Sequence, residues 1–144
     1  GSGLVGSEMC IRDSGWRYYL TPALQGRFGA RRGALAVGVL WGLWHLPLNL
    51  FFYSPDTSLQ SIAAQLVVCV TLGVFFTFAY EKCGKNIWLP VVLHYLNNSM
   101  VLVWTGTADI SNQIISWTDV AISAIMYGVV FLPFLAAKCY RKNK

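Results

Sequence analysis

Thr57–Tyr80 reads TSLQSIAAQLVVCVTLGVFFTFAY, a run of 24 residues without Asp, Glu, Lys or Arg. A helix that crosses the hydrocarbon core of a bilayer needs about 20 such residues. Three further uncharged stretches are comparable: Gly33–Pro55, Asn86–Ala108 and Val120–Ala137. All 17 charged residues of the 144-residue chain, 11 basic and 6 acidic, lie outside the four stretches. Continuous apolar runs, unlike the alternating pattern of a membrane barrel, predict four transmembrane helices.

The composition of the chain supports this fold class. Apolar residues make up 56% of the sequence and charged residues 12%, about half the charged share of soluble domains. This excludes a disordered chain and argues against a water-soluble domain. We expect an all-α polytopic membrane helix bundle with four transmembrane helices. An amphipathic or partial helix at Gly15–Arg32, rich in aromatic residues and arginines, is expected before them.

The charges of the connections alternate in sign along the chain. Basic residues precede the first span, dominate the connection around Glu81 and close the chain, whereas the other connections carry only Asp56, Asp109 and Asp119. The positive-inside rule then places both termini in the cytoplasm, and we expect a bacterial cytoplasmic membrane. The net charge of +5 therefore indicates topology. We expect the lipid bilayer as a partner and no nucleic acid.

The first fourteen residues differ in character from the rest. Gly1–Ser14 is GSGLVGSEMCIRDS, and its Met9–Ser14 part resembles translated adapter sequence at the ends of assembled environmental reading frames. We expect residues 1–14 to be a non-native, disordered leader and residues 15–144 to be a fragment of a membrane domain. The alternative is a genuine flexible tail.

The two histidines of the chain lie deep inside expected spans, His45 in the first and His94 in the third. These spans run in the same direction, so the two imidazoles are expected at comparable depths and facing one another. Ionisable residues within a membrane usually face a bundle interior and mark functional sites. The alternative is a pair of polar side chains that hydrogen-bond across helices for packing.

Residues spaced four apart share one helix face with each histidine. We expect them to form a polar pocket inside the bilayer. Its expected lining is Trp41, His45, Asn49, His94, Asn97 and Asn98. Two imidazoles could also hold a divalent metal or a haem between helices, but two ligands are few for such a site.

Prolines and glycines near the histidines predict local geometry. Pro47 and Pro90 each remove a helical hydrogen bond beside a histidine and should loosen the helix there. Gly38 and Gly42 should let another helix approach closely.

Four segments taken together resemble the CPBP family of intramembrane proteases, which includes the CAAX prenyl protease type and bacterial abortive-infection and bacteriocin-immunity relatives. The resemblance extends from Gly15 to the C-terminus. It implies a metallo- or glutamic-type endopeptidase that cleaves a membrane-associated peptide or protein. The segments are GWRYYLTPAL (Gly15–Leu24), RFG (Arg27–Gly29), WGLWHLP (Trp41–Pro47) and HYLNN (His94–Asn98).

The resemblance also implies roles for individual residues. The family's aromatic-x-x-x-His motif falls on Trp41 and His45, and its His-x-x-x-Asn motif on His94 and Asn98. A glutamate would activate a water molecule, the histidines would orient it or polarise the scissile carbonyl, and the Asn would stabilise the oxyanion. Arg17 would hold the first motif in place by ion pairing, with a positive-inside anchor as the alternative.

The first family motif, Glu-Glu-x-x-x-Arg, is where this sequence departs from the pattern. Its Arg corresponds to Arg17, so the glutamates should stand where Arg12 and Asp13 are. We infer that the pair is missing, that Asp13 is an accidental carboxylate and that the chain as written is inactive. Two non-enzymatic alternatives are a membrane scaffold or immunity protein that binds a peptide in the same pocket, and a bis-His haem or metal bundle.

Overall fold

A computed structural model describes residues 13–106 and 109–141, without the side chains of residues 101, 102, 104 and 105. Every regular element in this part of the chain is helical, which confirms the all-α class. The elements are η1 (Gly15–Leu20), α2 (Thr21–Phe28), α3 (Ala30–Trp44), α4 (Leu46–Leu48), η2 (Asn49–Tyr53), η3 (Pro55–Thr57), α5 (Ser58–Lys82), α6 (Trp88–Thr105), α7 (Trp117–Phe131), η4 (Leu132–Ala136) and η5 (Lys138–Tyr140).

Three helical segments of the described residues are long and apolar enough to cross a membrane: Ala30–Tyr53, Pro55–Lys82 and Trp117–Ala136. They contain most of the first, second and fourth expected spans. The third expected span corresponds to α6, which is not one of these three and carries the polar residues His94, Asn97 and Asn98 in its middle. The described residues therefore form a membrane helix bundle in which three of the four expected spans meet this criterion of length and hydropathy.

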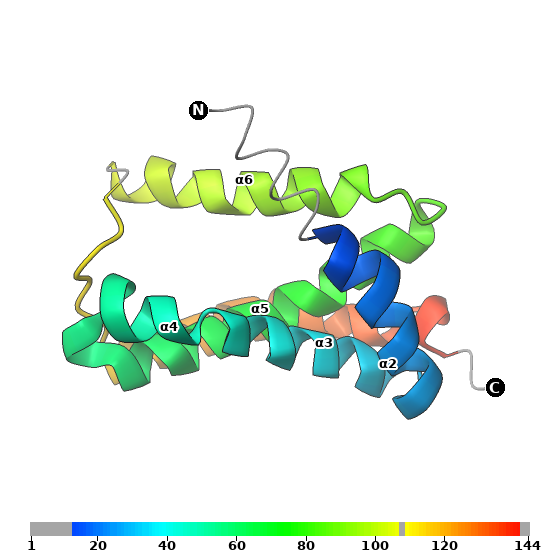
Figure 1. Cartoon of the computed structure of the whole chain (residues 1–144), viewed down its shortest axis with the longest axis horizontal. Coiled ribbons are helices and arrows are strands. Elements are labelled where there is room, and N and C mark those ends of the chain that lie inside the picture. The colour runs from blue at the N-terminus through cyan, green and yellow to red at the C-terminus, as the bar shows by residue number, and fades with distance from the viewer. Residues whose placement is uncertain (1–12, 107–108, 142–144) are drawn as a thin grey trace.

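The long helices run along one axis, each antiparallel to the next (Figure 1). α3 and α6 therefore run in the same direction, as expected for the spans that lead to His45 and carry His94. The central helix α5 contacts α3, α6 and α7. A buried cluster fills the space around α5: Trp41, Cys69, Leu72 and Phe76. By contrast, the apolar side chains of α7 are largely exposed, as Val129 is at 70%. This arrangement suits a helix that faces lipid.

Glycines set the contact between α3 and α5. A Cβ built on Gly38 would lie 2.5 Å from Val70 Cα, and one on Gly42 would lie 2.7 Å from Leu66 Cδ2. No larger residue fits at Gly38 without moving the α5 backbone. The predicted close approach of a second helix at Gly38 and Gly42 is confirmed, and the partner is α5.

The two prolines beside the histidines behave differently. Pro47 follows a break at His45, where the helix ends and a new turn begins at Leu46, so the predicted loosening is confirmed. Pro90 lies in the first turn of α6. The prediction for Pro90 is wrong, because a proline in the first turn of a helix removes no hydrogen bond within that helix.

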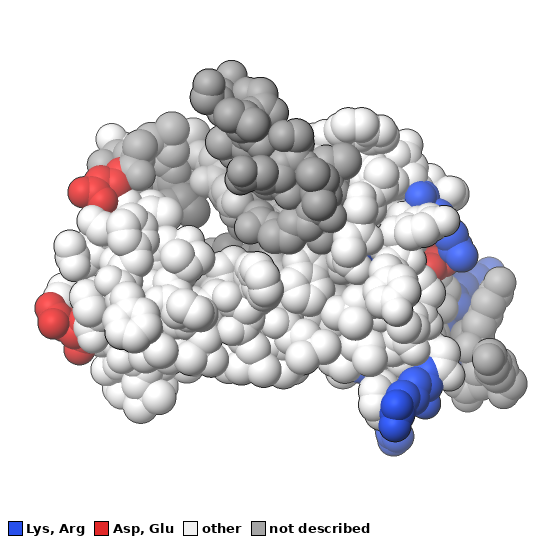
Figure 2. All heavy atoms as spheres, in the orientation of Figure 1, with Lys and Arg blue, Asp and Glu red and all other residues white. Residues whose placement is uncertain are grey.

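The charged side chains gather at opposite ends of the molecule (Figure 2). Lys and Arg lie at the end formed by the α2–α3 junction, the α5–α6 connection and the C-terminal segment, together with Glu81 of α5. Aspartates lie at the other end, where η3 and the α6–α7 connection are. The alternation of charge along the sequence thus becomes a separation of charge in space.

Candidate active site

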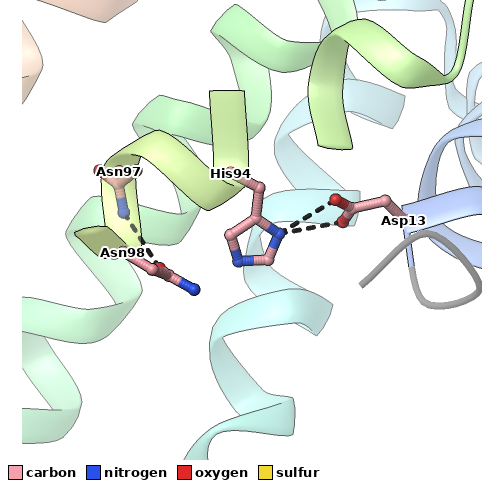
Figure 3. Close-up of polar contacts among 4 residues, drawn as sticks. All are labelled: Asp13, His94, Asn97 and Asn98. Atoms are coloured by element: carbon pink, nitrogen blue, oxygen red, sulfur yellow. Dashed lines mark hydrogen bonds and ion pairs between the residues drawn. The ribbon is translucent and has the colours of Figure 1, made fainter. Parts of the chain in front are cut away.

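A buried carboxylate–imidazole pair connects the start of the described chain to α6. The Nδ1 atom of His94 lies 3.1 Å from Oδ2 and 3.2 Å from Oδ1 of Asp13 (Figure 3). Both side chains are almost fully buried, at 3% and 1% exposure. A carboxylate oxygen accepts from a ring N–H, so Nδ1 carries a proton, and in the neutral tautomer Nε2 then keeps a lone pair. Figure 3 shows the second ring nitrogen on the side away from Asp13.

Arg17 supplies the positive charge next to this pair. It is 1% exposed, and its Nη1 donates to Gly73 O and Thr77 Oγ1, each at 3.2 Å. Its guanidinium carbon also lies 5.4 Å from the ring centroid of Trp41. Burial lowers the pKa of Arg17 to about 10, and the negative charge of Asp13 acts in the opposite direction. At neutral pH the arginine therefore stays charged and compensates the buried carboxylate.

The hydrogen bonds of Arg17 fasten η1 to α5, while the negative charge of Asp13 acts on it through space. The expected ion-pairing role of Arg17 stays a prediction. The alternative, an exposed anchor on the cytoplasmic side, does not agree with its burial. Arg17 is an interhelical contact in the interior of the bundle.

Trp41 lies against both histidines. Its ring centroid is 5.1 Å from that of His94 and 6.2 Å from that of His45, both in edge-to-face arrangements. The structure thus brings the two imidazoles to one place, with Trp41 in contact with each. Trp41 is 3% exposed, and its buried Nε1 has no hydrogen-bond acceptor among the described residues. This indole is a wall of the site with a donor available to a ligand.

His45 is half-buried at the end of α3. Its Nδ1 lies 2.9 Å from Trp41 O, one turn earlier. Since a carbonyl oxygen accepts, this contact places the proton on Nδ1 and leaves the lone pair on Nε2, as in His94. The helix break at His45 and Pro47 thus presents an imidazole with a fixed orientation.

Asn49 has a structural role in this arrangement. Its Nδ2 donates to His45 O at 2.9 Å, and its Oδ1 accepts from Ser61 Oγ at 2.5 Å. It is 1% exposed. These bonds connect η2 to α5 and to the backbone of His45. We expected Asn49 to line a pocket, but in the structure it holds the backbone that carries His45.

The two asparagines of α6 lie on the surface of the helix. Asn98 is exposed and Asn97 half-buried, and Asn97 Nδ2 lies 3.5 Å from Asn98 Oδ1. Figure 3 shows the Asn98 side chain one turn from His94, on the same side of α6. The predicted shared face of His94 and Asn98 is confirmed.

Asp13 is the residue that the sequence analysis set aside. Residues 1–12 of the expected leader lie outside the described residues, but Asp13 and Ser14 are helical and lead directly into η1. Asp13 therefore stands one helical turn before Arg17 and reaches His94 on α6. The sequence did contain one indication of this role: Asp13 lies four residues before Arg17, where the family that the chain resembles has its second glutamate.

The described residues contain no group of three or more His, Cys, Asp or Glu side chains placed to hold a metal ion. A porphyrin between His45 and His94 would also have to displace the buried Trp41 ring that contacts both.

Comparison with known proteins gives two matches. Residues 12–100 match the family described as "Type II CAAX prenyl endopeptidase Rce1-like". A curated relative, "CAAX prenyl protease 2" of Methanococcus maripaludis, is 30% identical over 93 residues, which are 61% of this chain and 34% of the relative. The chain therefore spans about a third of the length of that relative. No solved structure matches. The family match covers every site residue described above.

Proposed function

Because the chain belongs to the Rce1-like family of type II CAAX prenyl endopeptidases, we propose that it carries the catalytic part of an intramembrane endopeptidase. Its substrate class is a membrane-associated protein or peptide. The observation that carries this proposal is the buried Asp13–His94 pair, which lies beside a tryptophan that also contacts His45. Its location among apolar helices supports a reaction at the membrane.

In this proposal, the side chains have separate tasks. A glutamate at position 12, as in the family pattern, would take a proton from a water molecule that attacks the scissile carbonyl carbon. It would then pass this proton to the amide nitrogen as the C–N bond breaks, which releases a carboxyl and an amine product. His45 and His94 would orient this water or polarise the carbonyl through Nε2, and the Asn98 amide would donate to the oxyanion. Asp13 would hold the tautomer and orientation of His94, as carboxylates commonly do for catalytic imidazoles.

The sequence of this chain departs from that scheme at position 12. Arg12 stands at the position of the first glutamate, and the carboxylate of Asp13 is engaged by His94. We therefore propose that the chain as printed is nearly inactive and that one substitution, Arg12→Glu, supplies the missing base. A positioned general base contributes about 10²–10⁴-fold to the rate.

The test compares Arg12→Glu with the matched control Arg12→Gln, which removes the same positive charge without adding a carboxylate. Both are made in the full chain and in a chimera that carries the upstream part of the Methanococcus maripaludis relative. Cleavage of a fluorogenic peptide anchored in lipid vesicles is measured. We expect activity from Arg12→Glu alone and its loss on adding His45→Ala or His94→Ala. Equal rates for Glu and Gln, or activity that survives both His substitutions, would overturn the proposal.

The same experiment addresses the non-enzymatic alternative. A scaffold or immunity protein would bind the vesicle-anchored peptide and release no product in any variant. Its binding would survive His94→Ala and would depend on the bulk of Trp41, which is tested by Trp41→Ala.

A further inference from the structure

A cavity of about 460 Å³ lies at the basic end of the molecule, away from the two histidines. It is open to the surface between the α2–α3 junction and the C-terminal segment. Three arginines and two aromatic rings dominate its lining: Arg31, Arg32, Arg141, Phe28 and Tyr140. No acidic side chain is among its described lining residues. The cavity therefore combines a size typical of ligand sites with a surplus of positive charge in its lining, while the negative charge of Glu81 acts on Tyr140 from outside that lining.

The walls of the cavity come from distant parts of the chain that are fastened to one another. Arg31 Nε donates to Leu135 O of η4 at 3.1 Å. Tyr140 is 2% exposed, and its Oη donates to Val74 O of α5 at 2.6 Å. These bonds hold η4 and η5 against α3 and α5. The hollow is thus a product of the tertiary fold and does not belong to one flexible tail.

Two helix ends meet at the cavity wall. Gly29 has a φ of 84° and separates the end of α2 at Phe28 from the start of α3 at Ala30. The first turn of α3 carries a partial positive charge and the last turn of α2 a partial negative charge, so the arginines determine the sign of the potential. The guanidinium of Arg27 also lies 5.7 Å from the ring centroid of Phe28 at the rim.

The position of the cavity relative to the membrane indicates the source of a ligand. It lies at the end where Lys and Arg gather, which the positive-inside rule assigns to the cytoplasmic face (Figure 2). That leaflet carries anionic lipids, whose phosphates sit at the depth of basic side chains at helix ends. All three cations that line the cavity are arginines, whose planar guanidinium matches phosphate oxygens in a bidentate manner.

We propose that this cavity binds a phosphate group, either that of an anionic phospholipid headgroup or a free phosphate of the same chemistry. Arg32 and Arg141 pair with the phosphate oxygens, while Arg31 is held by Leu135. The adjacent rings of Phe28 and Tyr140 contact the apolar part of a headgroup. This site is independent of the peptidase proposal, because none of its residues contacts the histidines.

The experiment uses the full chain purified in detergent and native mass spectrometry. Phosphatidylglycerol, phosphatidylcholine and inorganic phosphate are added separately, and the bound adducts are counted. The test variant is Arg32→Gln/Arg141→Gln. The matched control is Lys82→Gln/Lys138→Gln, which removes two exposed charges from the same end outside the cavity lining.

We expect wild-type protein to retain phosphatidylglycerol over phosphatidylcholine and the test variant to lose at least about tenfold in this preference, because each arginine loses a charge-assisted hydrogen bond to the phosphate. The control variant should keep it. Retention of inorganic phosphate, with competition against phosphatidylglycerol, would identify free phosphate as the ligand; retention of the lipid alone would identify the headgroup. Equal binding by wild-type and test variant, or an equal loss in the control, would overturn the proposal. Arg32→Lys/Arg141→Lys serves as the folded comparison if the Gln variant aggregates, and it should lose part of the preference because the bidentate geometry is lost.

Discussion

Replacing Gly38 by alanine should destabilise the bundle at its tightest helix crossing. The new Cβ would lie 2.5 Å from Val70 Cα and 3.0 Å from Cys69 O, both backbone atoms of α5. Ordinary contacts begin at 3.4 Å, so α5 must move by about 0.9 Å relative to α3. A backbone neighbour cannot rotate away as a side chain can. Val70 and Cys69 therefore transmit the displacement along α5.

The size of the effect follows from three contributions. Overpacking of this kind costs about 1–3 kcal/mol, while Ala gains about 1 kcal/mol over Gly in a helix. α5 also carries both acceptors of Arg17, Gly73 O and Thr77 Oγ1, at 3.2 Å. Weakening a hydrogen bond to a buried charge costs a further 1.5–3 kcal/mol or so. We expect a net loss of roughly 2–4 kcal/mol in the free energy of unfolding.

Two other glycines provide a graded comparison. A Cβ on Gly42 would meet the end of the flexible Leu66 side chain at 2.7 Å, so the cost there should be smaller. A Cβ on Gly26 in α2 has nothing within 4 Å, and Gly26→Ala should stabilise the protein by up to about 1 kcal/mol. Unfolding in mixed detergent–SDS micelles, followed by far-UV circular dichroism, measures all three. Equal midpoints for Gly38→Ala and Gly26→Ala would refute the reasoning.

Three further predictions concern buried polar groups. Asp13→Asn should lower the free energy of unfolding by about 1–3 kcal/mol, because it weakens the hydrogen bond with buried His94 and removes a negative charge that acts on buried Arg17. Asp13→Asn/Arg17→Gln should cost less than the sum of its single variants, and additive effects would show that the charges are uncoupled. Tyr140→Phe removes the bond to Val74 O and should cost about 1 kcal/mol in the same unfolding assay; no change would show that water replaces it. Burial raises the pKa of Tyr140 above its ordinary value of 10, so its contribution to stability is present below pH 10 and is lost as the pH rises further. Ultraviolet titration should show an ionisation above pH 10 in the wild type that is missing from Tyr140→Phe.

The positions of the helices were predictable because they depend on local sequence. Lack of charge over about 20 residues is a one-dimensional property, and it predicted α5 to begin near Ser58, where it does. The break at His45 and Pro47 likewise follows from the chemistry of one residue. The close approach at Gly38 was predictable as a feature, but its partner, Val70 on α5, was not. Which surfaces meet depends on the rotation of each helix about its own axis.

The site was predictable only in part for the same reason. Spacing placed His94 and Asn98 on one face, and depth placed His45 near them. No sequence rule indicated that Trp41 would contact both imidazoles or that Asn49 would accept a hydrogen bond from Ser61. Asp13 is 81 residues from His94 in sequence. Because it lies in the adapter-like segment Met9–Ser14, nothing around it indicated a contact with His94.

The glycine crossing and the buried charges form one structural unit. Arg17 Nη1 lies 4.0 Å from the position that a Cβ on Gly73 would occupy, and it reaches the carbonyl oxygen of that same residue. A Cβ on Gly73 would also lie only 3.2 Å from Gly38 Cα. A side chain at either glycine would therefore separate the helices or obstruct the guanidinium, and Asp13 would lose its compensating charge. The orientation of His94 depends on its hydrogen bond with Asp13. We therefore expect substitutions at Gly38 and Gly73 to change the orientation of the imidazole, although neither glycine contacts it.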